Sequence, residues 1–166
     1  MTAVFPGSFD PFTLGHEDIL RRGAKLFDKI IIAVLHNPAK APLFTVQERL
    51  NMLGTIDLPG VSAEEHRGLL ADFAKQRGAK YILRGVRTEA DCAYEIPMAQ
   101  ANAKLNEGPE TVILVSDPAF SYMSASLIRE IATAAYSSPG FDDRILDQWV
   151  SPAVKDMLRA KCGIIY

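Results

Sequence analysis

Two short, almost uninterrupted apolar runs restrict the folds open to this sequence more strongly than anything else in it. Lys29–Leu35 reads KIIIAVL, and Thr111–Val115 reads TVILV. Runs of this kind are typical of strands that are covered on both faces, as in a parallel sheet. Thr2–Phe5 and Tyr81–Leu83 read as further short strands, and Val61–His66 reads as a weaker one.

The stretches between these strands carry helical patterns. Glu17–Phe27 places apolar side chains on one stripe of a helix, and residues 45–48 (TVQE) form a capping-box pattern that opens a helix to about Leu53. Pro97 lies inside a further helical pattern, where it is expected to kink the helix or to mark a late start. The remaining predicted helices are Leu69–Arg77 closed by Gly78, Glu89–Asn106, Ser124–Ala134, Asp142–Trp149 and Ser151–Lys161.

This alternation of strands and helices predicts the α/β class, as a Rossmann-like, doubly wound parallel sheet with helices on both faces. A length of 166 residues favours a single domain over residues 1–166, with C-terminal helices at about 142–161. In an open parallel sheet, ligands bind beyond the carboxyl ends of the strands. The loops after Phe5, Leu35, Leu83 and Val115 are therefore expected to meet at one site.

The composition argues against several classes of function. A net charge of −2 gives no reason to expect nucleic acid or an anionic membrane as a partner. No apolar stretch reaches the roughly 18 residues that a membrane-spanning helix needs, and the first residues lack the pattern of a signal peptide. Cys92 and Cys162 form neither a metal-ligand spacing nor a disulfide framework, which fits a reducing compartment. We therefore expect a cytoplasmic protein.

The loop after the first predicted strand has the character of a phosphate-binding loop. Gly7 and Gly15 have no Cβ and let the backbone approach a ligand, and Ser8 offers a hydroxyl. His16 lies where the next helix begins, and the free N–H groups of a helix start suit a phosphate. Neither G-x-G-x-x-G nor G-x-x-x-x-G-K-[ST] occurs, which speaks against a dinucleotide dehydrogenase and a P-loop NTPase.

The loops after the later strands each add positive charge. Lys40 lies between two prolines, Arg84 and Arg87 flank a glycine, and Arg129 lies one turn into a helix with a serine-rich start. Taken singly, each of these signals also describes ordinary surface residues. Together with His16 they predict one cationic cleft. A nucleoside triphosphate and a phosphomonoester carry about six negative charges, and such a cleft is what binding both would need.

The motifs resemble a known superfamily. Residues 6–16 (PGSFDPFTLGH) resemble the T/H-x-G-H signature of the nucleotidyltransferases. The resemblance narrows to the bacterial phosphopantetheine adenylyltransferase family on residues 37–45 (NPAKAPLFT), Glu48-Arg49, residues 83–87 (LRGVR), Asp91 and Tyr94-Glu95. It runs from about residue 4 to residue 134. It implies transfer of the adenylyl group of ATP to 4′-phosphopantetheine, giving dephospho-coenzyme A and pyrophosphate.

The same resemblance implies roles for single residues. His16 matches the histidine that binds ATP and stabilises the transition state, and Lys40 and Arg84 match catalytic cations that bind substrate phosphate. Ser8 is implied to contact both substrates, and Leu70 to contact pantetheine. The other ATP-binding positions implied are Phe9, Gly85, Val86, Arg87, Glu95, Phe120, Ser121, Tyr122, Met123, Ser124, Ala125 and Ser126.

The resemblance further implies Mg²⁺ carried by the ATP phosphates without a metal ligand from the protein, a homohexamer, and feedback inhibition by coenzyme A. The implied reaction is in-line attack on the α-phosphorus, and it needs no general base because a phosphomonoester dianion is already a nucleophile. The sequence departs from the family pattern at Ala125, which interrupts a run of serine or threonine, and at Thr133, where an arginine is often found.

Two alternative functions stay open. Residues 124–129 (SASLIR) also resemble the final motif of the nicotinate-mononucleotide adenylyltransferases, although position 13 is threonine and not histidine. The second alternative is a non-catalytic nucleotide-binding module, against which the presence of His16, Lys40 and Arg84 counts.

Overall fold

The sheet of this protein is entirely parallel and has five strands. The computed structural model describes residues 1–36, 41–105, 108–138 and 140–163. Within these residues the strand order is β3-β2-β1-β4-β5, and every neighbouring pair is parallel. The strands are β1 Thr2–Gly7, β2 Lys29–Leu35, β3 Val61–His66, β4 Tyr81–Val86 and β5 Glu110–Val115. The predicted Rossmann-like α/β class is confirmed.

Helices connect the strands and follow the last one. They are α1 Leu14–Gly23, α2 Val46–Leu53, α3 Leu70–Gln76, α4 Glu89–Lys104, α5 Ala125–Tyr136 and α6 Pro152–Cys162. Short 3₁₀ turns cover Pro118–Phe120 and Asp143–Gln148. Over the described ranges, no helix combines the length and the apolar character needed to cross a membrane.

Some predicted boundaries shift for local reasons. α1 begins before Glu17, at Leu14, because Thr13 caps it. β4 continues past Leu83 to Val86, so the arginine motif begins inside the strand and not in a loop. The late start at Pro97 is wrong, because α4 begins at Glu89 and runs through the proline. Ala93, whose carbonyl loses its usual helical partner at Pro97, is exposed and open to water. The predicted helix at 142–149 is a 3₁₀ turn.

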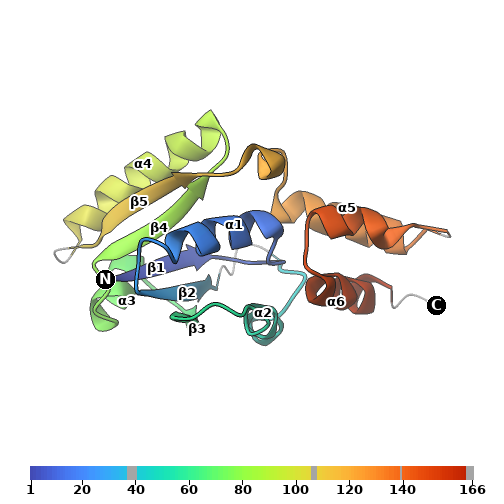
Figure 1. The fold of residues 1–166 in the computed structure, drawn as a ribbon, viewed down its shortest axis with the longest axis horizontal. Helices are drawn as coiled ribbons and strands as arrows, with labels where there is room; N and C mark the ends of the chain where they lie inside the picture. The colour runs from blue at the N-terminus through green and yellow to red at the C-terminus, as the bar shows by residue number, and fades with distance from the viewer. Residues whose placement is uncertain (37–40, 106–107, 139, 164–166) are drawn as a thin grey trace.

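The alternation of side chains along the strands builds an apolar core on each face of the sheet. Ala3 and Phe5 of β1 face α1 and α2, where they meet Ile19 and Leu20. Val4 faces the opposite side, where the buried side chains of α3 cover it. Figure 1 shows α1 lying in front of the sheet, and α4 lies against β4 and β5. Both faces of the sheet are covered, as the continuous apolar runs predict.

A third apolar cluster lies beyond the carboxyl ends of the strands. α5 and α6 pack side by side there, to the right of the sheet in Figure 1, together with Phe44 and Met52. The N–H of Leu14 donates to the carbonyl of Trp149 at 2.8 Å, and Lys161 pairs with Glu48 at 2.8 Å. The C-terminal elements therefore brace the first turns of α1 and α2, which lie next to the site described below.

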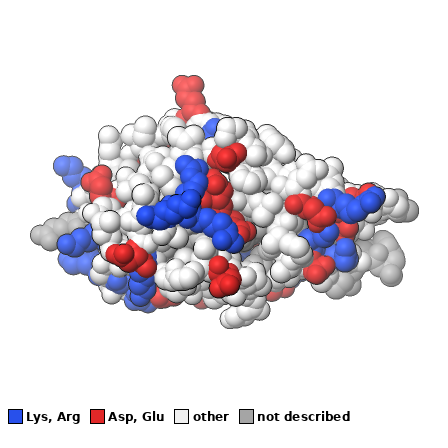
Figure 2. Space-filling view, viewed as in Figure 1, with Lys and Arg blue, Asp and Glu red and all other residues white. Residues whose placement is uncertain are grey.

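Charged side chains on the face formed by α1 are paired locally. Figure 2 shows positive and negative groups next to one another across the described part of this face. On α1, Arg21 pairs with Glu17 and Arg22 with Asp18, at one-turn spacing. Arg22 also donates to the carbonyl of Val115 at 2.8 Å, which ties α1 to the end of β5.

The sheet opens between its two central strands. β1 pairs with β2 along its whole length, but it pairs with β4 only at Ala3–Tyr81 and Val4–Ile82. Beyond these pairs the carboxyl ends of β1 and β4 separate. The chain order also reverses here, because β1 leads to β2 on one side and has β4 on the other. A crevice at such a switch point is the usual ligand site of an open parallel sheet.

Candidate active site

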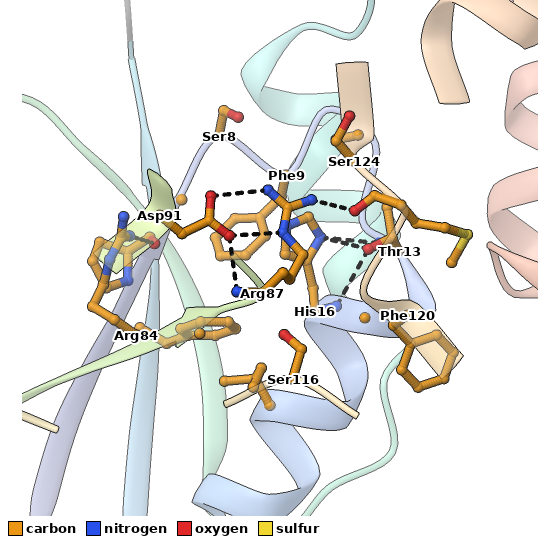
Figure 3. Close-up of a pocket in the computed structure, with 18 of the residues that line it drawn as sticks. Ser8, Phe9, Thr13, His16, Arg84, Arg87, Asp91, Ser116, Phe120 and Ser124 are labelled. Carbon is orange, nitrogen blue, oxygen red and sulfur yellow. Dashed lines mark hydrogen bonds and ion pairs between the residues drawn. The ribbon is translucent and has the colours of Figure 1, made fainter. Parts of the chain in front are cut away.

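A cleft of about 380 Å³ lies over this opening, and most of the predicted site residues line it. Its walls come from the loop after β1, the start of α1, the end of β4 and the segment before α5 (Figure 3). The predicted residues that line it are Ser8, Phe9, His16, Arg84, Gly85, Arg87, Glu95, Phe120, Met123, Ser124, Ala125 and Ser126. Val86, Ser121 and Tyr122 do not line it, and Lys40 lies outside the described residues.

Thr13 holds His16 in the first turn of α1. The Thr13 hydroxyl accepts the N–H of His16 at 3.3 Å, and Nδ1 of His16 in turn lies 3.1 Å from the backbone nitrogen of Thr13. This is a capping box in which histidine takes the place usually held by glutamate or glutamine. The box satisfies two free helix-end donors and fixes the direction of the imidazole.

The cap determines the protonation of His16. Nδ1 accepts the Thr13 backbone N–H, so it carries no proton of its own, and the ring proton of the neutral form is on Nε2. Burial, followed by the positive charges of Arg87 and Arg84, lowers the pKa of His16 from 6.5 to about 4. Near neutral pH, His16 is therefore an uncharged Nε2–H donor.

Aromatic rings support the imidazole from below. The buried Phe9 ring meets His16 edge-on at 5.2 Å, and the Phe12 ring stacks on it at 5.7 Å. Phe9 has a φ of 49°, a region that few residues other than glycine adopt, and its side chain is almost fully buried. The loop accepts this backbone strain where it places the ring beneath His16.

Arg84 fills the gap between the separating strands. One of its nitrogens donates to the carbonyl of Pro6 at 2.7 Å, so the side chain bridges β1 and β4 where their backbones no longer pair. Nε donates to Glu95 of α4 at 2.7 Å, and a second short bond makes the pair bidentate. Glu95 is largely buried and fixes the guanidinium plane, as fork-on-carboxylate geometry does.

Arg87, directly after β4, is also held by a carboxylate of α4 and a backbone carbonyl. Its Nε lies 3.1 Å from Asp91 of α4, and its Nη1 donates to the carbonyl of Met123. Figure 3 shows its guanidinium beside the imidazole of His16, between Asp91 and the segment that carries Ser124. Arg87 therefore links α4 to the segment before α5 across the cleft.

A second cavity, of about 660 Å³, adjoins the cleft on the side of α2 and α5. Ser8, Arg84, Ala125 and Ser126 line both spaces, and Arg129 lines only the second. The predicted cations His16, Arg84, Arg87 and Arg129 thus surround two connected hollows. The structure shows the predicted convergence of the loops after the first, fourth and fifth strands, and the described part of the loop after the second strand lines the second cavity.

A third cavity, of about 290 Å³, opens beside Arg84 between α3 and α4. Leu70, the predicted pantetheine contact, lines it together with Tyr94, Met98 and Asn102. The hydroxyl of Thr111 also lines it, and this buried oxygen has no hydrogen-bond partner among the described residues. The cavity is thus apolar with a few polar atoms, which suits an elongated organic group with amides.

Two buried charged residues of the site were not predicted from the sequence. Arg49 is 3% exposed and donates to the carbonyls of Ser8, Leu35 and Thr45, with no carboxylate partner among the described residues. Asp10 is 2% exposed and binds backbone N–H groups beyond β2. The available signal was that both residues lie within the motifs that carry the family resemblance, residues 6–16 and Glu48-Arg49.

The donors around the cleft suit anions and not a metal ion. Within the described ranges, no group of three or more histidine, cysteine, aspartate or glutamate side chains could hold a metal. Guanidinium, imidazole and hydroxyl groups line the cavities together with helix starts. The carboxylates that also line them, Asp10, Asp91 and Glu95, are each paired with an arginine. Such a site can bind two phosphorylated molecules side by side and stabilise charge that develops between them.

The sequence is similar to known nucleotidyltransferases. Residues 4–131 match the family described as cytidylyltransferase-like. Over 132 residues the chain is 50% identical to the phosphopantetheine adenylyltransferase of Caldanaerobacter subterraneus subsp. tengcongensis, covering 78% of this chain and 82% of that protein. Over 133 residues it is 52% identical to the phosphopantetheine adenylyltransferase of Rhizorhabdus wittichii, covering 79% of this chain and 81% of that one.

A solved structure shares the fold at much lower identity. Plasmodium falciparum nicotinic acid mononucleotide adenylyltransferase, complexed with NaAD, has a TM-score of 0.69 and 15% identity. The likeness covers 98% of this chain and 96% of that one. At this identity the likeness extends to the fold alone.

Proposed function

The chain belongs to the cytidylyltransferase-like family and, within it, to the phosphopantetheine adenylyltransferases, and from this we propose its reaction. It transfers the adenylyl group of ATP to 4′-phosphopantetheine, and the products are dephospho-coenzyme A and pyrophosphate. The observation that carries this function is identity to proteins of that name at about half of the aligned residues, in alignments that cover about four fifths of both chains.

We place the substrates by the character of the three cavities. The adenosine and α-phosphate of ATP occupy the cleft over His16, and the outer phosphates extend into the adjoining cavity toward Arg129. The 4′-phosphate meets the nucleotide beside Ser8 and Arg84, which line both spaces. The pantetheine arm extends into the third cavity beside Leu70. Arg84 is the one residue named here that lines all three, so its guanidinium lies where the two substrates meet.

In the proposed reaction the protein aligns the reactants and stabilises charge. An oxygen of the 4′-phosphate forms a bond to the α-phosphorus, the bond from that phosphorus to the β-bridging oxygen breaks, and pyrophosphate leaves with the electron pair. Nε2–H of His16 donates to an α-phosphate oxygen, and a single such donor is worth about 3 kcal/mol. Arg84, Arg87 and Lys40 offset the remaining negative charge.

Mg²⁺ fits this site as an ion that arrives on the nucleotide. The cleft presents arginine, histidine and serine, its two carboxylates are paired with arginines, and the described part of the chain has no group of three or more metal-ligating side chains. When bound to ATP, Mg²⁺ neutralises phosphate charge and makes pyrophosphate a better leaving group. The chain's own cations bind the phosphate oxygens that the ion leaves free.

Exposed apolar side chains on α4 support the association of copies of this chain, as a homohexamer would require. α4 is inverted relative to an ordinary surface helix, because Glu95 and Asn102 are buried while Tyr94, Ile96 and Met98 are exposed. A gathering of exposed apolar side chains of this kind is typical of an interface between protein chains. We propose that copies of this chain associate through α4, in the cytoplasm, and that coenzyme A inhibits by occupying the substrate cavities. Light scattering on the purified protein tests the hexamer.

The reaction is tested by supplying ATP with 4′-phosphopantetheine or with nicotinate mononucleotide, each with Mg²⁺, and measuring pyrophosphate and the adenylylated product. We expect dephospho-coenzyme A to form, with at most a trace of product from the mononucleotide. Preferential turnover of the mononucleotide would identify the rival enzyme. ATP binding without either product would identify a non-catalytic nucleotide-binding module. Addition of coenzyme A to the same assay measures the inhibition.

A further inference from the structure

Asp10 lies at the centre of a small buried network beside the second cavity. Its carboxylate accepts the backbone N–H of Leu43 at 3.0 Å and of Phe44 at 2.9 Å. The same carboxylate accepts Nη1 of Arg129 at 2.8 Å, and the same nitrogen lies 2.9 Å from the carbonyl of Asp10. One side chain thus joins the loop after β1, the segment before α2 and the second turn of α5.

The network leaves part of Arg129 free for a ligand. Nη1 is fully engaged by Asp10, while the one contact of Nη2 among the described residues is a long one of 3.4 Å with the hydroxyl of Ser126. Arg129 lines the second cavity and its side chain is 26% exposed. A long arginine loses side-chain entropy when it binds a ligand, and a carboxylate that already holds one nitrogen removes much of that cost.

We propose that Asp10 is a positioning residue for the proposed adenylyl transfer: it holds Arg129 in the orientation that binds the phosphates of ATP. Asp10 itself contributes no group to the substrates. Its carboxylate holds one nitrogen of Arg129 and, through the backbone of Leu43 and Phe44, the segment whose residues 41 and 42 line the same cavity. The proposal rests on the proposed function, because it concerns the triphosphate of that reaction.

The arrangement of the cavities indicates which substrate Arg129 serves. Its neighbours Ala125 and Ser126 line both the nucleotide cleft and the second cavity. The third cavity, beside Leu70, has no lining residue from the segment before α5 or from α5 itself. The loss of Asp10 should therefore change the KM for ATP and leave the KM for 4′-phosphopantetheine nearly unchanged.

The test is a double-mutant cycle with Asp10→Asn, Arg129→Gln and the double variant, with steady-state constants measured for both substrates. Asparagine keeps the size of the side chain but replaces one acceptor by a donor that repels Arg129 and the backbone N–H groups. We expect Asp10→Asn to raise the KM for ATP by about 10- to 100-fold. In the Arg129→Gln background, the same change should add less than about twofold, because the two residues act as one unit.

The matched control is Glu64→Gln, which likewise removes the carboxylate partner of an arginine, Arg77. Neither residue of this pair lines any of the three cavities. It should leave both KM values as in the wild type. Independent, additive effects of Asp10→Asn and Arg129→Gln, or equal rises in the KM of both substrates, would assign Asp10 a structural role only and overturn the proposal.

Two further measurements keep the result unambiguous. If Asp10→Asn shows no cooperative unfolding transition, Arg129→Lys takes its place, since lysine can meet Asp10 but has no second nitrogen for a phosphate. A wild-type KM for ATP in Arg129→Lys overturns the proposal. Wild-type protein is assayed alongside: if it forms no dephospho-coenzyme A, the proposed function fails, whereas an active wild type with an additive cycle rejects only the role of Asp10.

Discussion

The backbone N–H of Thr13 lies 3.1 Å from Nδ1 of His16, so the residue that starts α1 also selects the tautomer of the imidazole. The hydroxyl of Thr13 takes part in both roles, because it also lies 3.0 Å from Nδ1 of His16. The same hydroxyl accepts the N–H of His16 at 3.3 Å, and the backbone nitrogen of Thr13 donates to the ring. A histidine at the third position of a helix would otherwise be free to rotate or to change tautomer.

Replacing Thr13 by valine removes the hydroxyl from both of its contacts with His16. Valine keeps the shape and the backbone N–H but cannot cap the helix, so the first turn of α1 should fray and the imidazole lose its fixed direction. We expect a loss of about 1 kcal/mol in the free energy of unfolding and a lower kcat. Urea denaturation and steady-state kinetics measure the two effects. Thr13→Ser, which keeps the hydroxyl, should behave as the wild type, and equal losses in both variants would rule out the capping role.

The depressed pKa of His16 makes the stability of the protein depend on pH. In the unfolded chain the imidazole takes up a proton below about pH 6.5, whereas in the folded protein it does so only near pH 4. Between these values the unfolded state holds more protons, so the free energy of unfolding falls as the pH is lowered. The contribution of His16 to this fall is at most about 3 kcal/mol.

The comparison that isolates this effect is His16→Gln, which keeps a hydrogen-bonding side chain but cannot titrate. Wild type and variant should converge in stability as the pH falls from 7 to 4. An NMR titration of the imidazole in the wild type should show no protonation above about pH 5. A midpoint near 6.5 would mean that burial and the arginine charges do not act on His16 as the structure indicates.

Local sequence signals were sufficient for much of the fold. The β-branched run Lys29–Leu35 is β2 without a change of boundary, and the TVQE pattern caps α2 through Thr45 and Glu48. These features depend on neighbours in sequence, where backbone preference and side-chain capping act directly. The convergence of the cation-bearing loops also followed, because the parallel sheet alone determines which strand ends share an edge.

What the sequence does not reveal are contacts between distant segments. Arg129 and Asp10 are 119 residues apart, and no local pattern marks their pairing. The apolar run predicts a strand that ends at Leu83, with Arg84 in a loop. In the structure β4 continues to Val86, although it no longer pairs with β1 there. Glu95 was assigned to ATP binding by resemblance, and the structure adds that its carboxylate already holds Arg84. These features depend on three-dimensional packing, which the spacing of residues along the sequence does not show.

Glu95→Gln should release Arg84 from α4. The neutral amide can accept from only one side of the guanidinium fork, so the bidentate pair becomes a single hydrogen bond. Because Arg84 lines all three cavities, we expect the kcat/KM for 4′-phosphopantetheine to fall by about 10- to 100-fold. Arg84→Lys should give a similar loss, since it also abolishes the fork. Wild-type kinetics in Glu95→Gln would show that this carboxylate does not orient Arg84.

Gly85 allows α1 to lie close against β4, and this contact sets the height of His16 over the cleft. A Cβ at position 85 would lie 2.7 Å from Cγ1 of Ile19, a buried side chain one turn after His16. The backbone of Gly85 does not have a positive φ, so alanine there meets a steric obstacle and no strain in its own torsions. Gly85→Ala should therefore push α1 away from the sheet.

We expect Gly85→Ala to cost about 1–3 kcal/mol in the free energy of unfolding and to lower kcat, because His16 moves with α1. Ile19→Ala removes the obstructing atom but leaves a cavity of its own, with a cost of about 2–5 kcal/mol. In the double variant the new methyl group occupies part of that cavity. The loss in the double variant should thus be smaller than the sum of the two single losses. The difference should exceed about 0.5 kcal/mol, the largest deviation from additivity usual for independent sites. Strict additivity in urea denaturation would mean that the Gly85–Ile19 contact does not set the position of α1.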